Sequence, residues 1–71
     1  EPWVAAFLGY GHGLHAPGLC HAQAAYQSAH HMLLAHALAV QVYRQGNYGG
    51  KIGLILNLNH ILPASQRPED L

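Results

Sequence analysis

From His21 to Gln45 the sequence contains neither glycine nor proline, and alanine is its commonest residue. Alanine and leucine favour helix strongly, so this stretch predicts one long helix. Apolar side chains recur along it at steps of three and four residues, which places five of them on one face: Ala25, Ala29, Leu33, Ala37 and Val40. Further apolar groups extend to the neighbouring faces: Leu34, Leu38 and Val42. We therefore expect a helix that is covered on several sides.

The segments that flank this helix carry turn signals. Residues 9–18 contain four glycines and a proline, which predicts an irregular loop. After the helix, Asn47, Gly49 and Gly50 suit positive φ angles and predict its end.

A second regular element is predicted beyond this turn. Residues 51–58 form a short apolar run without clean alternation, which is typical of a parallel strand covered on both faces. Residues 60–67 are expected to be loop, and Pro68-Glu69-Asp70 resembles the first turn of another helix. With residues 1–8 as the end of an earlier strand, the order is one βα repeat and the beginning of the next. The expected fold class is α/β, and ligand sites in such folds lie at the carboxyl ends of the strands.

The composition is too apolar for a free-standing domain of this size. Only 8% of the 71 residues are charged, against about 25% in a typical soluble domain. A chain this short buries only about 60% of its unfolded surface. We therefore expect a part of something larger, or a subunit that hides its surface against partners.

The charges and the single cysteine restrict the partners and the cellular location that we expect. Three basic residues balance three acidic ones, which argues against nucleic-acid binding. No apolar run approaches the ~20 residues of a membrane-spanning helix, so no membrane partner is expected. Cys20 is the only cysteine, which favours a reducing, cytoplasmic location.

The triplet Glu1-Pro2-Trp3 carries the most chemical information. A carboxylate at the end of a barrel strand suits a general acid, and an adjacent indole offers a flat apolar face to a sugar ring. By itself the triplet also fits a solvated glutamate beside a core tryptophan.

Short motifs lie along the whole chain in a fixed order and spacing: Glu1-Pro2-Trp3, Gly9-Tyr10, residues 13–18, His30-His31, Leu34-Ala35-His36, Ile52-Gly53, Leu56-Asn57 and Pro68-Glu69-Asp70. Together they resemble the family 1 glycoside hydrolases, the β-glucosidase family. The resemblance implies a TIM (β/α)8 barrel that hydrolyses β-glycosides with retention of configuration. Residues 1–71 would form the end of its fourth strand, its fourth helix, its fifth strand and the start of its fifth helix. They would be a partial barrel and not a complete domain.

The resemblance also implies roles for individual residues. Glu1 would be the catalytic acid/base, and Trp3 would line the leaving-group side of the cleft. His15 and Asn57 would supply hydrogen bonds to the substrate. The alternative for His15 is a structural role in the loop, and the alternative for Asn57 is a polar cap on the strand. A retaining mechanism needs a second carboxylate as nucleophile. Glu69 and Asp70 do not match the nucleophile motif of the family, which lies on a later strand.

The resemblance implies no cofactor and no metal. The partners it implies are a β-glycoside or oligosaccharide substrate, and the remainder of the barrel, which would be needed for folding and activity. The isolated chain is expected to be inactive.

Seven histidines leave another interpretation open, a non-catalytic helical module that binds a metal or haem or that oligomerises. Against a metal, the helical histidines are not spaced by the four residues typical of a zinc-binding helix, and no set of thiolates accompanies them. A degenerate gene fragment without function is a third interpretation.

Overall fold

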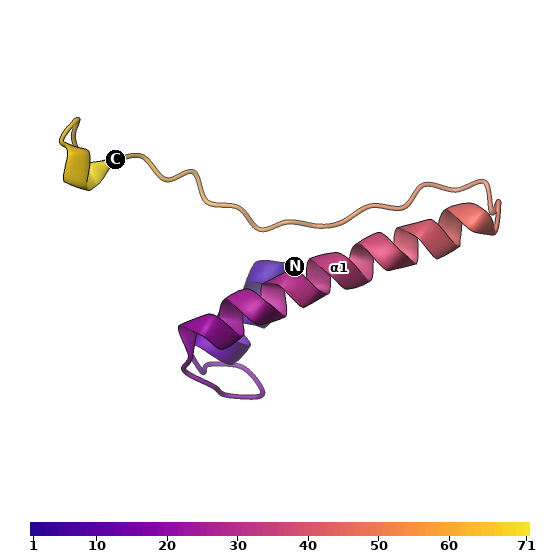
Figure 1. The fold of residues 1–71 in the computed structure, drawn as a ribbon, viewed down its shortest axis with the longest axis horizontal. Helices are drawn as coiled ribbons and strands as arrows, with labels where there is room; N and C mark the ends of the chain where they lie inside the picture. The colour runs from indigo at the N-terminus through magenta and orange to yellow at the C-terminus, as the bar shows by residue number, and fades with distance from the viewer.

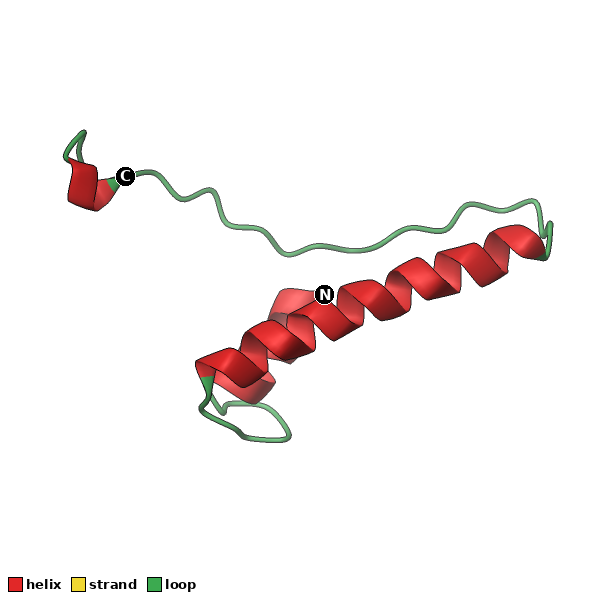
Figure 2. Cartoon of the chain, viewed as in Figure 1, coloured by secondary structure: helices red, strands yellow, loops and turns green.

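The computed structural model describes all residues 1–71 and consists of helices and connecting segments. The elements are a π-helix, η1 (Val4–Gly11), a long α-helix, α1 (Ala22–Gln45), and one 3₁₀ turn, η2 (Pro68–Asp70). Figure 2 shows helices and loops and no strand. None of the helices has the combination of length and hydropathy that spanning a bilayer requires.

Helix η1 replaces the strand end and part of the loop that were expected at the N-terminus. The chain is already helical at residues 2 and 3, and Pro2 is well suited to a first helical position. The turn is wide, because the N–H of His12 donates to the carbonyl of Phe7, five residues earlier, at 2.6 Å. The loop prediction for residues 9–18 was therefore wrong for Gly9 to Gly11. Glycines suggested a break there, but the alanines and Leu8 before them favour helix.

The remaining loop folds back onto η1. The N–H groups of His15, Leu19 and His21 donate to three successive carbonyls of η1, those of Leu8, Gly9 and Tyr10, at 2.8–2.9 Å. The loop lies so close to η1 that position 9 must be a glycine. A Cβ on Gly9 would lie 2.6 Å from the carbonyl oxygen of Ala16 in the loop. The loop is thus tied to the helix along its length.

The prediction of α1 is confirmed almost to the residue. It begins after His21, whose ring accepts a hydrogen bond from the N–H of Ala24, and it ends at Gly46. Asn47 then takes a positive φ of 51°, as expected for a turn residue after a helix.

Helix η1 packs against the amino-terminal half of α1 (Figure 1). The residues buried at this contact are small: Ala6, Gly9 and Ala25. The prediction that one face of α1 is covered is confirmed only at the start of the helix. Farther along this face, Leu33 is 48% exposed and Ala37 is also exposed. No element of residues 1–71 covers residues 33–45 of α1. Large apolar side chains are therefore exposed to solvent there: Leu33, Leu34, Leu38 and Val42.

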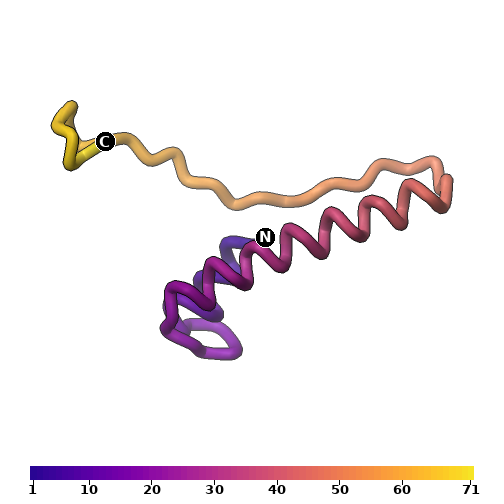
Figure 3. The backbone as a smooth tube through the Cα atoms, in the orientation of Figure 1, coloured from indigo at the N-terminus to yellow at the C-terminus, as the bar shows by residue number.

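The strand predicted over residues 51–58 is not formed. These residues run extended and exposed, in a course that turns back along α1 (Figure 3). A strand needs a neighbour to receive its backbone hydrogen bonds, and residues 1–71 offer none. The helix start predicted at Pro68-Glu69-Asp70 is present as η2, where the N–H of Asp70 donates to the carbonyl of Arg67.

Candidate active site

Glu1 lies at the start of the helical turn that leads into η1. Its backbone carbonyl accepts a hydrogen bond from the N–H of Ala5 at 3.3 Å, so the residue is joined to the helix through its main chain. Its side chain is exposed. The carboxylate is therefore free to meet a ligand, on a backbone that η1 holds in place.

Trp3 follows within the same turn and has helical dihedral angles (φ −59°, ψ −46°). Its indole is in offset stacking contact with Phe7, with ring centroids 6.3 Å apart and planes inclined by 19°. The side chain keeps 39% of its surface exposed. An acid and an indole thus share one turn of helix, whereas the sequence predicted that Glu1 lies at the end of a strand.

His15 and Asn57 are exposed and occupy different parts of the chain. His15 lies in the loop, where its N–H donates to Leu8 and its carbonyl accepts from Gly18. Asn57 lies in the extended segment and its side chain forms no hydrogen bond. The structure joins Glu1, Trp3 and His15 through η1, and it does not bring Asn57 into this group.

The two other carboxylates lie at the far end of the chain. Glu69 is exposed in η2, and the carboxylate of Asp70 accepts a hydrogen bond from the hydroxyl of Ser65. Figure 1 shows this carboxyl-terminal turn well apart from the amino terminus. Neither carboxylate is placed to act together with Glu1.

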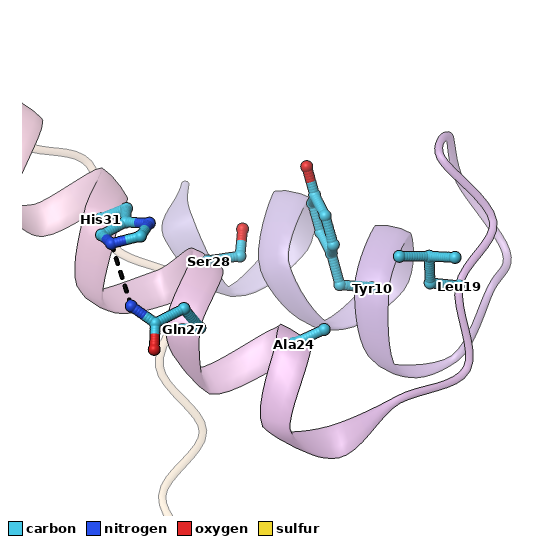
Figure 4. A pocket seen from close by; sticks show the side chains of 6 residues that line it. All are labelled: Tyr10, Leu19, Ala24, Gln27, Ser28 and His31. Atoms are coloured by element: carbon cyan, nitrogen blue, oxygen red, sulfur yellow. Dashed lines mark hydrogen bonds between the residues drawn. The ribbon is translucent and has the colours of Figure 1, made fainter.

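A shallow open pocket of about 280 Å³ lies between the end of η1 and the start of α1 (Figure 4). It is lined by Tyr10, Leu19, Ala24, Gln27, Ser28 and His31. The amide nitrogen of Gln27 lies 2.9 Å from Nε2 of His31, one helical turn away. None of the predicted site residues lines this pocket. The contact of Gln27 with His31 could have been predicted from their four-residue spacing in a helix.

The histidines are dispersed. No three histidine, cysteine or acidic side chains come together in a group that could hold a metal ion. The rings of His30 and His31 lie 5.8 Å apart and are tilted, and His31 is engaged by Gln27. His21 is used as the cap of α1.

The family model of glycosyl hydrolase family 1 matches residues 1–71, which is the whole chain. The chain belongs to glycosyl hydrolase family 1. This confirms the resemblance drawn from the motif order. Membership of this family implies a TIM barrel as the fold to which residues 1–71 contribute.

Curated members of the family match along the whole chain. Beta-glucosidase A of Thermotoga maritima is 44% identical over 71 residues, which are all of this chain and 16% of that protein. The 1,4-beta-D-glucan glucohydrolase of Thermotoga neapolitana is also 44% identical, over all of this chain and 17% of that protein. Beta-glucosidase 4 of rice, Oryza sativa subsp. japonica, is 43% identical over 75 residues, which are 99% of this chain and 16% of that protein. The chain therefore spans about one sixth of the length of these family 1 relatives.

The family match explains why the structure shows helices and unpaired extended chain. In a TIM barrel every strand lies between two other strands and beneath helices. Residues 51–58 are apolar apart from Lys51 and Asn57, which fits a strand covered on both faces, yet they lie exposed here.

Proposed function

We propose that residues 1–71 supply the acid/base carboxylate and part of the leaving-group side of a retaining β-glycosidase active site. The substrate would be a small soluble glycoside with a terminal β-linked sugar, glucose being the first choice. The observation that carries the proposal is the family match over all 71 residues, with Glu1 and Trp3 held on one helical turn. Relatives named as β-glucosidases support the choice of substrate.

In the first step Glu1 donates its proton to the glycosidic oxygen as the bond from this oxygen to the anomeric carbon breaks. A second carboxylate attacks the anomeric carbon from the opposite face and forms a glycosyl-enzyme. In the second step Glu1 takes a proton from water, the water oxygen attacks the anomeric carbon, and the nucleophile leaves. Two inversions give overall retention.

The nucleophile lies outside residues 1–71 in this proposal. The two carboxylates of a retaining enzyme stand about 5–5.5 Å apart, and Asp70 is instead bound to Ser65 in η2. A later strand of the barrel would carry the nucleophile.

The leaving group would lie against the open face of Trp3. His15 and Asn57 would donate or accept hydrogen bonds at its edge. For Asn57 this requires that residues 51–58 pair with neighbouring strands, so that the barrel closes and the ends of its strands converge.

We assign residues 1–71 to the end of the fourth strand, the fourth helix, the fifth strand and the start of the fifth helix of the barrel. The rest of the barrel is then the partner that covers the apolar side of α1 and makes folding and activity complete. No metal or cofactor takes part in this chemistry, and a cytoplasmic location is part of the proposal.

The test is a chimera in which residues 1–71 replace the matching segment of the Thermotoga maritima relative. We expect it to hydrolyse aryl β-glucosides. Glu1→Gln should lower kcat/KM about 10²- to 10⁴-fold for poor leaving groups, because acid assistance is lost. Dinitrophenyl glucoside should still form the glycosyl-enzyme, because its leaving group needs no proton. Glu69→Gln, which changes an exposed carboxylate far from the site, is the matched control.

Azide distinguishes an acid/base from a nucleophile. Azide needs no general base, so it should release the glycosyl-enzyme of Glu1→Gln as the β-glycosyl azide. An α-glycosyl azide would show that Glu1 is the nucleophile. A folded chimera that does not hydrolyse glucosides would overturn the proposed function itself.

A further inference from the structure

A chain of three aromatic rings runs from the candidate active site to α1. Trp3 stacks on Phe7, with centroids 6.3 Å apart and planes 19° apart. Phe7 in turn meets Tyr26 of α1 edge to face, at 5.2 Å and 88°. Both distances and both angles are those that attractive aromatic pairs adopt.

Small residues between the two helices make this chain of rings possible. Ala6 and Ala25 are fully buried where η1 and α1 meet, so the two backbones approach closely. A Cβ on Gly11 would lie 3.3 Å from the Cβ of Ala25 and 3.6 Å from the ring of Phe7. Phe7 therefore has a defined place, between its own helix and the neighbouring one.

This packing limits the orientations of Trp3. The indole is in offset stacking contact with Phe7, while 39% of the side chain remains exposed. The contact restrains the ring and leaves part of its surface open to a ligand. An indole without this support would have to lose rotamer freedom when a ligand bound.

We infer that Phe7 and Tyr26 are positioning residues for the leaving group of the substrate. They act through Trp3, by holding its open face ready for a flat or apolar leaving group. The inference rests on the proposed function, because it takes Trp3 as the surface that meets the leaving group.

The position of Trp3 in the reaction sequence predicts which kinetic constant changes. The leaving group departs in the first step, so it is absent when water attacks the glycosyl-enzyme. For an activated aryl glucoside, whose second step is slow, loss of leaving-group contacts raises KM and leaves kcat nearly unchanged. A methyl glucoside has no ring to stack and should be affected least.

The kinetic test uses the chimera described above. Phe7→Ala and Tyr26→Ala should each raise KM for an aryl β-glucoside about two- to tenfold, the range that an aromatic pair contributes. The ring-preserving variants Phe7→Tyr and Tyr26→Phe should keep the original KM. The Tm of each variant is measured beside its KM, so that a folding defect is distinguished from loss of the ring contact. Tyr48→Ala removes a ring from a pair elsewhere, with Tyr43 at 5.3 Å, and is the matched control.

The second test reads the position of Trp3 directly in the 71-residue chain. Trp3 is its only tryptophan, so fluorescence excited at the red edge of indole absorption reports on this residue alone. Phe7→Ala and Tyr26→Ala should lower the anisotropy of Trp3 and increase quenching by iodide. The two ring-preserving variants and Tyr48→Ala should match the parent chain.

The outcomes separate the inference from the proposed function. If the chimera is active and both alanine variants keep the parental KM, the positioning role is wrong and the proposed function stands. Unchanged Trp3 fluorescence in both alanine variants would equally overturn the positioning role. If the parental chimera folds but has no activity, the proposed function fails, and the inference about the leaving group fails with it, whatever the fluorescence shows.

Discussion

The imidazole of His21 caps the long helix by accepting a hydrogen bond, at Nδ1, from the backbone N–H of Ala24 at 3.2 Å. Serine, threonine, aspartate and asparagine are the usual residues at this position. An imidazole can accept this bond only while Nδ1 carries a lone pair, which means in the neutral form. The first turn of α1 also contains no acidic residue.

Loss of this cap should therefore loosen the start of α1. His21→Ala removes the acceptor and leaves the N–H of Ala24 without its side-chain partner. No acidic side chain in the first turn is available to compensate.

The measurement is the far-ultraviolet circular dichroism of the 71-residue chain. A cap is worth about 0.5–2 kcal/mol, so the helix signal of His21→Ala should fall below that of the parent. His21→Asn keeps a capping side chain and should retain the parental signal. His31→Asn, which removes the contact with Gln27 but no cap, is the control. Equal helix signals in His21→Ala and in the parent would contradict the prediction.

Gly9→Ala should release the loop from η1. The new Cβ would lie 2.6 Å from the carbonyl oxygen of Ala16, and both groups are backbone-anchored, so the loop must move. Overpacking of this kind costs about 1–3 kcal/mol, which predicts about five- to 150-fold faster amide exchange at Leu19. Gly53→Ala, whose Cβ meets nothing within 4 Å, is the matched control. Protection of Leu19 that survives in Gly9→Ala would show that the loop is held by other means.

The 71-residue chain alone should not hydrolyse glycosides. Glu1 has no second carboxylate beside it, because Glu69 and Asp70 lie in η2 at the other end of the chain. A retaining mechanism needs both groups within about 5–5.5 Å. The assay is the release of nitrophenol from an aryl β-glucoside, with the active chimera for comparison. Turnover by the chain alone at the rate of the chimera would contradict both this prediction and the assignment of the nucleophile to another strand.

Leu38→Ala should have little effect in the isolated chain and should destabilise the chimera. In the chain alone Leu38 is 52% exposed, so its truncation should leave the helix signal nearly unchanged. In the chimera the barrel covers this side of α1, and truncation should cost about 2–5 kcal/mol. Scanning calorimetry of the chimera measures the fall in Tm, with the exposed polar Gln41 changed to alanine as the control. Equal Tm values for both variants would argue against the assignment of α1 to a covered barrel helix.

The sequence was sufficient for α1 because its limits depend on local signals. Uninterrupted helix formers, followed by Gly46 and Asn47, define it without reference to any other part of the chain. The same local reasoning failed at η1. There Gly9 and Gly11 suggested a loop, but Gly9 lies close to Ala16 of the loop and Gly11 lies close to Ala25 of α1.

The strand predicted over residues 51–58 from their apolar run is not formed in the structure. A helix satisfies its own backbone, whereas a strand depends on neighbours. In the candidate site, too, local features could be predicted and packing could not. The adjacency of Glu1 and Trp3 follows from the triplet. The contact of Phe7 with Tyr26 depends on how η1 packs on α1, which no sequence motif indicates.

The backbone bonds between the loop and η1 fix the number of residues as well as their positions. His15, Leu19 and His21 meet three consecutive carbonyls, so one residue added between them would shift at least one pairing. After α1 the chain has no such bonds from Tyr48 to Gly50. Length variation among related sequences should therefore collect just after α1 and avoid the loop before it. A gap within residues 13–20 of an alignment then indicates that the hydrogen bonds between the loop and η1 have changed.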